Sequence, residues 1–119
     1  MLSAIIVFAH GSRIESANDA VRKAAVDLAR AGGFPVVEAA FLELGKPDLA
    51  SAVASVVSNG ARHVTVIPYF LTLGLHLERD LPRLIDGIAT VYPDLDIRVT
   101  PPLDGHPALI EALLDRAKH

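Results

Sequence analysis

The sequence predicts an α/β fold: a three-layer arrangement in which helices cover both faces of a parallel, four-stranded sheet. Short β-branched runs without polar alternation are typical of strands that are buried on both faces. These runs alternate along the chain with segments whose apolar residues recur at helical spacing. Strand–helix alternation with right-handed crossovers produces a parallel sheet. A chain of 119 residues has the size of one domain, so we expect a single domain over residues 1–119.

The first half of the chain is predicted to contain two strand–helix units. Residues 3–9 (SAIIVFA) form a continuous apolar run typical of a buried parallel strand. Apolar residues then recur at helical spacing over residues 15–31, and the two glycines that follow are a helix stop. A second strand is expected at residues 36–41. The second helix opens at Pro47-Asp48 and ends before Gly60.

The second half repeats the alternation. Residues 62–68 (RHVTVIP) are predicted to form the third strand. The next helix is expected to start near Asp80, because Pro82 fits best in the first turn of a helix. A short fourth strand is predicted at residues 96–99, and a final helix at residues 107–117.

Four loops follow the carboxyl ends of the predicted strands. In an open parallel sheet, ligands bind beyond these ends, where the loops lead into the next helices. The candidate functional residues should therefore be sought in these loops, which span residues 10–13, 42–47, 69–79 and 101–106.

Two histidines occupy these loops in positions that favour a shared site. His10 directly follows the first strand and His76 lies beyond the third. Taken singly, His10 is equally compatible with a hydrogen-bonded strand end followed by Ser12 as a helix cap, and His76 with a packed loop residue. The first and third strands are expected to be neighbours, so both histidines should face one crevice. The sequence therefore predicts a two-histidine site.

Glu43, just past the second strand, is a candidate carboxylate for the same crevice, although it could also be solvated. The sequence contains no Cys, which excludes thiolate ligands, iron–sulfur clusters and disulfides. A site of two imidazoles and one carboxylate suits cobalt, nickel or iron better than magnesium or calcium. It also leaves coordination positions open, which a protein needs in order to pass its metal on.

Charge and composition limit the classes of partner. Eleven Lys and Arg against fourteen Asp and Glu give a formal charge of -3, which argues against a general nucleic-acid-binding protein. The opening apolar run is far shorter than the roughly 20 residues of a membrane span, so we expect no membrane partner and a cytoplasmic location. Hydrophobic residues make up 51% of the chain, and this excess favours a subunit interface.

Four segments together resemble the small, CbiX-like sirohydrochlorin chelatases over nearly the whole chain. They are AHGSR, AFLELGKPDL, IPYFLTLGLHLERDLP and PPLDGHPAL, in this order. The resemblance implies a chelatase-like half that inserts a divalent metal into sirohydrochlorin, a tetrapyrrole with eight carboxylates, on the way to cobalamin, sirohaem or a nickel tetrapyrrole. Larger members of the superfamily are similar to two such units in one chain, so the resemblance also implies a homodimer. Cobalt, nickel or iron would be a substrate, with no permanently bound cofactor.

The resemblance also implies roles for individual residues. His10 and His76 match the paired histidines that handle the metal, and Glu43 matches an acidic position after the second strand. One imidazole could accept a pyrrole proton while the other holds the incoming ion. Donors are needed for the substrate carboxylates, although each basic candidate could instead be a solvated surface charge. The expected substrate-binding residues are Ser12, Arg13, Glu43, Lys46 and Arg79.

Other classes of protein remain compatible with parts of this pattern. A non-catalytic metal or tetrapyrrole carrier would use the same pocket, and only turnover separates it from a chelatase. A histidine phosphatase also places His-Gly after its first strand, but its phosphate-binding Arg should directly precede the His, where this chain has Ala9. A purely structural α/β module is the remaining alternative.

Overall fold

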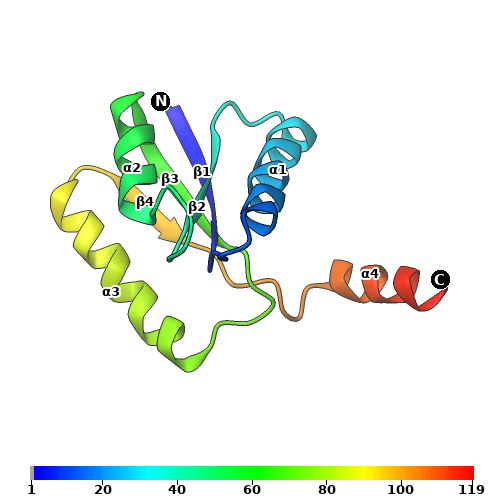
Figure 1. Ribbon diagram of the computed structural model, residues 1–119. Helices are drawn as coiled ribbons and strands as arrows, with labels where there is room; N and C mark the ends of the chain where they lie inside the picture. The colour runs from blue at the N-terminus through cyan, green and yellow to red at the C-terminus, as the bar shows by residue number, and fades with distance from the viewer. Residues whose placement is uncertain (1) are drawn as a thin grey trace.

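The computed structural model describes residues 2–119, and strands alternate with helices throughout (Figure 1). This alternation confirms the predicted fold class, and apart from the start of α3 the predicted segments agree with the observed bounds to within two residues. The strands are β1 (Leu2–Ala9), β2 (Val37–Phe41), β3 (Ala61–Pro68) and β4 (Asp96–Val99). The helices are α1 (Glu15–Gly32), α2 (Leu49–Ser58), α3 (Leu75–Val91) and α4 (Pro107–Ala117).

The strands form one parallel sheet in the order β2-β1-β3-β4. β1 pairs with both β2 and β3, which confirms the predicted contact between the first and third strands. The chain winds in one direction from β1 to β2 and in the other from β3 to β4. The reversal lies at the carboxyl ends of β1 and β3, where open α/β sheets bind their ligands.

Helices cover both faces of the sheet because successive strand residues point to opposite faces. On one face, Val7 and Ala9 of β1 pack with α1. On the other, Ile6 and Phe8 of β1 belong to the larger core with α2 and α3. Figure 1 shows α1 on one side of the sheet and α2 and α3 on the other. Within residues 2–119, no helix is both long and apolar enough to cross a membrane.

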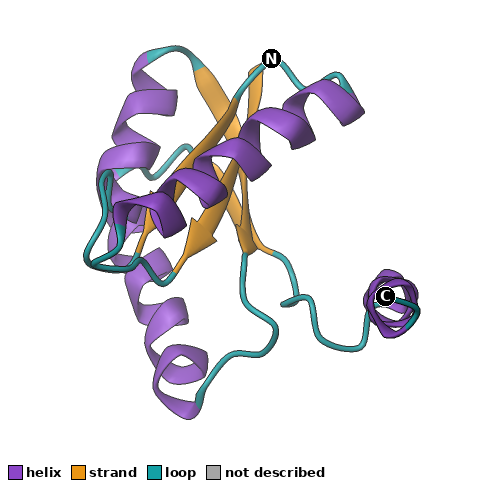
Figure 2. Ribbon diagram, turned by 45° about the vertical axis from the view of Figure 1, so that its right-hand side comes forward, coloured by secondary structure: helices purple, strands orange, loops and turns teal. Residues whose placement is uncertain are grey.

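α4 stands apart from these layers. It has no buried residue, and both views show it projecting away from the body of the fold (Figures 1 and 2). The radius of gyration is 14.7 Å, against about 13.5 Å for a compact chain of this length. Backbone hydrogen bonds from Leu103 to Phe70 (3.2 Å) and from Asp104 to Leu71 (2.6 Å) tie the segment before α4 to the segment after β3. These bonds lead the chain away from the sheet instead of back over it.

The predicted start of the third long helix at Asp80 was wrong, because α3 begins at Leu75. Pro82 therefore lies inside the helix and not in its first turn. The rule for proline ignores tertiary packing: Leu81 is buried and Leu77 packs against the larger core, and these contacts stabilise the turns before the proline. The loop predicted at residues 69–79 consequently ends at Gly74, which is the N-cap of α3.

Candidate active site at the carboxyl edge of the sheet

The loops after β1 and β2 continue the pairing of the two strands beyond the edge of the sheet. The Leu42 amide donates to the Ala9 carbonyl at 2.9 Å, and the Glu43 amide donates to the His10 carbonyl at 3.1 Å. These bonds carry the strand register past its last pair, Ala9 with Phe41. The structure therefore brings together His10 and Glu43, two of the side chains predicted to share a site.

Gly11 makes this close approach possible. Its φ angle is 96°, a left-handed conformation that favours glycine. A Cβ atom on Gly11 would lie 1.7 Å from the Glu43 carbonyl oxygen, so no larger residue fits without moving the second loop. The glycine after His10 is thus required by the packing of one loop against the other.

His10 and Glu43 form a solvent-accessible acid–base pair. His10 Nε2 lies 3.7 Å from Glu43 Oε1, and both side chains are 57% exposed. His10 Nδ1 is 3.2 Å from the Gly11 carbonyl, which can only accept, so Nδ1 carries the hydrogen in the neutral ring. The lone pair is then on Nε2, next to the carboxylate. This nitrogen can bind a metal ion or take up a proton, and Glu43 would stabilise the resulting cation.

His76 lies in a different setting from the predicted loop. It is exposed in the first turn of α3, and its Nδ1 accepts a hydrogen bond from Arg79 at 3.2 Å. Both views place the start of α3 well below the carboxyl edge of the sheet (Figures 1 and 2). Among the described residues, no hydrogen bond or ion pair joins His76 to His10. The structure thus pairs His76 with Arg79, and the two-histidine site stays a prediction.

Three of the other predicted substrate-binding residues, Ser12, Arg13 and Lys46, lie in the two loops that carry the His10–Glu43 pair. The Ser12 hydroxyl accepts from the Ile14 amide at 3.0 Å, a local contact just before α1. The N-cap of α1 is Ile14 and has no side-chain cap hydrogen bond, so Ser12 is not the helix cap that was the alternative to ligand binding. Arg13 and Lys46 are exposed. A depression of about 800 Å³ beside Glu43 is lined by Lys46 and the start of α2. This depression is the concave surface next to the pair.

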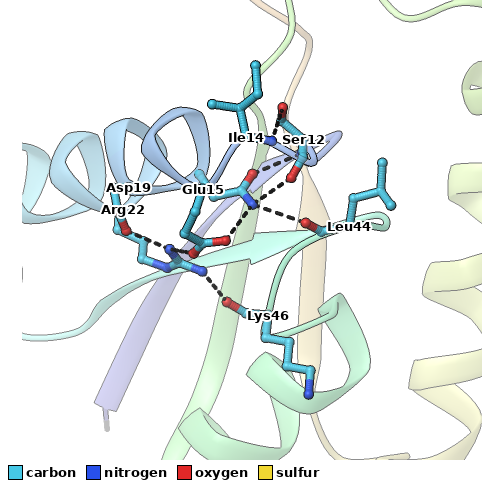
Figure 3. Close-up of polar contacts among 8 residues, drawn as sticks. Ser12, Ile14, Glu15, Asp19, Arg22, Leu44 and Lys46 are labelled. Carbon is cyan, nitrogen blue, oxygen red and sulfur yellow. Dashed lines mark hydrogen bonds and ion pairs between the residues drawn. The ribbon is translucent and has the colours of Figure 1, made fainter.

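Two side chains of α1 that the sequence analysis missed, Asn18 and Arg22, hold these loops. Figure 3 labels Arg22 and the loop residues Ser12, Leu44 and Lys46 that the two side chains contact. Asn18 is buried and hydrogen-bonds to Ser12 and Leu44, one residue in each loop. Arg22 donates to the Lys46 carbonyl at 2.9 Å and stacks over the ring of Phe41. A signal for Asn18 exists in the sequence, because this polar residue lies on the apolar stripe of its helix, three positions before Val21 and seven before Ala25.

Two carboxylates beside the loops are held in their charged form. Hydrogen bonding from the Arg22 guanidinium, with a smaller contribution from Asn18, lowers the pKa of Glu15. The backbone amide of Ser51 donates to Asp48 at 2.8 Å and lowers the pKa of that carboxyl. Asp48 is thereby the side-chain cap of α2. Neither carboxylate is free to act as a proton donor near neutral pH.

The chain by itself does not assemble a complete metal cage. Within residues 2–119, no group of three His, Asp or Glu side chains is placed to hold one ion. His63, remote from this edge, pairs with Asp96 at 3.0 Å across β3 and β4. His10 and Glu43 alone offer one nitrogen and one carboxylate, so any ion at this site would keep most of its coordination positions for other ligands.

Comparison with known proteins places this geometry in context. The sequence model of the family described as CbiX matches residues 4–119. The chain is 33% identical to the chloroplastic sirohydrochlorin ferrochelatase of Arabidopsis thaliana, over 97% of this chain and 51% of that protein. It is 35% identical to the sirohydrochlorin cobaltochelatase of Saccharolobus islandicus, over 98% of this chain and 93% of that protein.

The fold is also similar to that of a longer solved chain. The structure of the sirohydrochlorin chelatase SirB from Bacillus subtilis subspecies spizizenii in complex with cobalt superposes with a TM-score of 0.87 at 31% identity. The match covers 99% of this chain and 50% of SirB. The chain therefore spans about half the length of the plant and Bacillus proteins, and nearly all of the archaeal one.

Proposed function

Because the chain belongs to the CbiX family, we propose that it inserts a divalent metal ion into sirohydrochlorin, with cobalt, iron or nickel as the metal substrate. The observation that carries the proposal is the exposed His10–Glu43 pair at the carboxyl edge of the sheet. Relatives named as cobaltochelatase and ferrochelatase support the choice of reaction and, among the metals, of cobalt and iron. The metal is consumed in each turnover, and no permanently bound cofactor is required.

The chemistry of insertion fits a histidine next to a carboxylate. Two pyrrole N–H protons must leave the macrocycle as the metal–nitrogen bonds form. A neutral imidazole can accept such a proton, and a nearby carboxylate favours the imidazolium that results. His10 Nε2 faces Glu43 at 3.7 Å and carries the lone pair. We therefore assign to His10 the role of accepting these two protons one after the other and releasing each to solvent, to which its side chain is exposed, with Glu43 as its charge partner.

His76 is proposed to act on the metal rather than on the proton. Its Nδ1 already accepts from Arg79, so in the neutral ring Nε2 carries the hydrogen. Binding an ion through Nε2 would require the ring to change tautomer and give up its bond to Arg79. Arg79 would then be released to contact a substrate carboxylate, and this coupling supports the predicted role of Arg79 in substrate binding.

The remaining donors are proposed to hold the periphery of the tetrapyrrole. Arg13 and Lys46 are exposed on the two loops that flank the His10–Glu43 pair, and Arg79 is exposed near His76. Guanidinium and ammonium groups form charge-assisted hydrogen bonds with carboxylates. Arg13 and Lys46 at the edge of the sheet and Arg79 on α3 below it would contact acidic side chains at different points of a flat substrate.

The working partner of this chain is proposed to be a second copy of itself. α4 exposes three apolar side chains that lie next to one another on one face of the helix. They are Ile110, Leu113 and Leu114, and each is more than half accessible to solvent. In SirB the matched region is only half of the chain, so a second half is present there. A second copy would supply the equivalent half here and cover the apolar face of α4.

Turnover separates the chelatase from a non-catalytic carrier. Purified protein is incubated anaerobically with an excess of sirohydrochlorin and, separately, with Co²⁺, Ni²⁺ and Fe²⁺, and the visible spectrum is followed. A chelatase converts many equivalents of tetrapyrrole faster than a protein-free control. Conversion that stops at one equivalent per site would indicate a carrier, and a rate equal to the control for all three metals would refute the proposal.

A further inference from the structure

Asn18 connects the two loops that bear the proposed catalytic pair. It lies near the start of α1 and is 1% exposed. Among residues 2–119, it is the only buried polar side chain. A buried amide needs its hydrogen bonds satisfied, so the partners of Asn18 show what the residue is for.

The amide group of Asn18 is fully engaged by the loop backbones (Figure 3). Its Oδ1 accepts from the Ser12 amide at 2.9 Å, and its Nδ2 donates to the Ser12 carbonyl at 2.9 Å. The same Nδ2 donates to the Leu44 carbonyl at 3.0 Å, and the Glu15 carboxylate lies 3.3 Å away. A donor faces one side of the amide and acceptors face the other, which fixes its orientation.

The hydrogen bonds of Asn18 restrain residues that are close in sequence to His10 and Glu43. Ser12 is two residues after His10, and Leu44 directly follows Glu43. Leu44 has a φ angle of 59°, a left-handed conformation that is strained for leucine and persists only when its surroundings hold it. The hydrogen bond from Asn18 to the Leu44 carbonyl supplies such a restraint.

We propose that Asn18 is a positioning residue, whose amide holds the loop of Glu43 against the loop of His10 so that the two side chains face each other. The proposal deepens and rests on the chelatase function proposed above. Asn18 does not reach the reacting atoms, and it acts only through the geometry of the two loops.

The surroundings of Asn18 accept asparagine and reject its closest substitutes. An aspartate in its place would keep the shape and the acceptor, but it would lose both donors and face two carbonyls and the Glu15 carboxylate. Gly45 packs closely against the amide, since a Cβ atom on Gly45 would lie 3.1 Å from Asn18 Nδ2, so a longer side chain at position 18 would press against this loop. Asn18→Asp is therefore the variant that removes the restraint with the smallest change in volume.

The first test needs no substrate. Amide hydrogen exchange is measured by NMR in the wild type, in Asn18→Asp and in Asn59→Asp, which makes the same chemical change at an exposed site after α2. Exchange of the Glu43 amide should be faster in Asn18→Asp, while Val7 and Val66 of the core strands keep their protection. Unchanged exchange at Glu43 would overturn the proposal.

The second test measures turnover. A displacement of about 1 Å between reacting groups can cost about 100-fold in rate, so kcat of Asn18→Asp should fall by this order with a smaller change in KM. In a His10→Ala background the same substitution should cost little more, because the two residues serve one step. Losses that multiply, or a loss that equals the decrease in folded protein, would make Asn18 merely structural.

The two tests separate this proposal from the function on which it rests. If the wild type inserts no metal but Glu43 exchange responds as expected, the chelatase function fails and the positioning role of Asn18 stands. If Asn18→Asp unfolds, Asn18→Ser replaces it, since serine leaves the helix intact and removes the same restraint. Loss of protection throughout the sheet in both variants would overturn the proposal, because Asn18 would then support the fold as a whole.

Discussion

His10 and Glu43 lie close together because of their backbones, not because their side chains attract each other. Both side chains are 57% exposed at a separation of 3.7 Å, and exposed pairs contribute only about 0–1 kcal/mol. The bond from the Glu43 amide to the His10 carbonyl, the glycine at position 11 and the amide of Asn18 set the geometry instead. A reactive pair held in this way stays accessible to a large ligand.

The histidines are expected to be important for turnover and unimportant for stability. His10→Ala should lower the rate of metal insertion by about 100- to 10,000-fold, the usual range for acid–base groups, and His76→Ala should also remove most of the rate, because the metal loses its proposed ligand. Both side chains are exposed, so the urea midpoints should stay near that of the wild type. His119→Ala, at the end of the chain, is the control and should change neither quantity. A variant at either site that is destabilised by several kcal/mol yet active in its folded fraction would contradict the assignment.

Arg13 and Lys46 are expected to act on substrate binding. Arg13→Ala and Lys46→Ala should raise KM more than they lower kcat, because a contact made equally in the ground and transition states affects binding alone. Added salt should reduce the difference from the wild type, since exposed charges are screened. Arg30→Ala, in the last turn of α1, serves as the matched control. Steady-state kinetics at two ionic strengths measure these effects. An unchanged KM in both variants would show that Arg13 and Lys46 are solvated surface charges that do not bind the substrate.

The sequence could predict which loops contain the candidate site residues, but not which of their side chains lie next to each other. His10 and Glu43 follow adjacent parallel strands, and the rule for carboxyl ends was enough to bring them together. His76 could not be placed in the same way, because the path of the long segment after β3 depends on contacts that leave no local pattern. The two-histidine crevice therefore remains a prediction.

Helix ends show most directly how local sequence becomes structure. Asp48 was expected to open the second helix, and its carboxylate accepts from the Ser51 amide at 2.8 Å, three residues along. Such a cap satisfies one of the free N–H groups at the helix start. The helix that begins there also lines the depression beside Glu43. Its integrity therefore bears on the shape of the site.

Removal of this cap should destabilise the protein in a pH-dependent manner. Asp48→Ala should lower the free energy of unfolding by about 1 kcal/mol at pH 7. Because the fold lowers the pKa of Asp48, its charged form contributes stability above the ordinary carboxyl pKa of about 4, and this contribution is lost as the pH falls through the lowered value. The difference between wild type and variant should therefore shrink toward pH 2.

Urea unfolding at both pH values measures this effect. Asp48→Asn keeps an acceptor for the Ser51 amide and should unfold almost like the wild type at pH 7. An Asp48→Ala variant as stable as the wild type at pH 7 would show that the cap is dispensable.

The spacing of apolar residues was sufficient to predict the helices and strands, except where tertiary packing determines the start of a helix. Seven predicted segments needed only their own apolar pattern and their Gly or Pro boundaries. The start of α3 could not be predicted from the local sequence alone. Leu77 and Leu81 pack in the larger core and stabilise the helical turns that precede Pro82. Local rules for proline describe an isolated helix, and a core contact five residues earlier overrides them.

The three layers of the fold do not include α4, which has no buried residue. Within residues 2–119, α1 alone covers its face of the sheet, and α4 projects outward because its connecting segment is hydrogen-bonded to the segment after β3. The apolar excess in the composition predicted a buried interface but could not indicate where it would lie. The structure places part of that excess on α4, the element farthest from the core.

We therefore expect a dimer that depends on α4. Light scattering at micromolar concentration should give the mass of two chains for the wild type. Leu113→Glu should give one chain, because it puts a charge in the middle of the apolar face. Asp115→Lys, which reverses a charge on the side of the helix opposite the apolar face, is the matched control and should remain dimeric.

The stability of the monomeric variant distinguishes an interface helix from a structural one. α4 has no buried residue within one chain, so Leu113→Glu should not destabilise the monomer. Its urea midpoint should be close to that of the wild type, provided that the wild type is measured at a concentration low enough for its dimer to dissociate. At concentrations where the wild type is dimeric, its midpoint should rise with protein concentration, while that of the variant should not. A wild type that scatters as one chain at all concentrations, or a Leu113→Glu variant that still scatters as two, would mean that α4 serves a different purpose and that one chain carries the site alone.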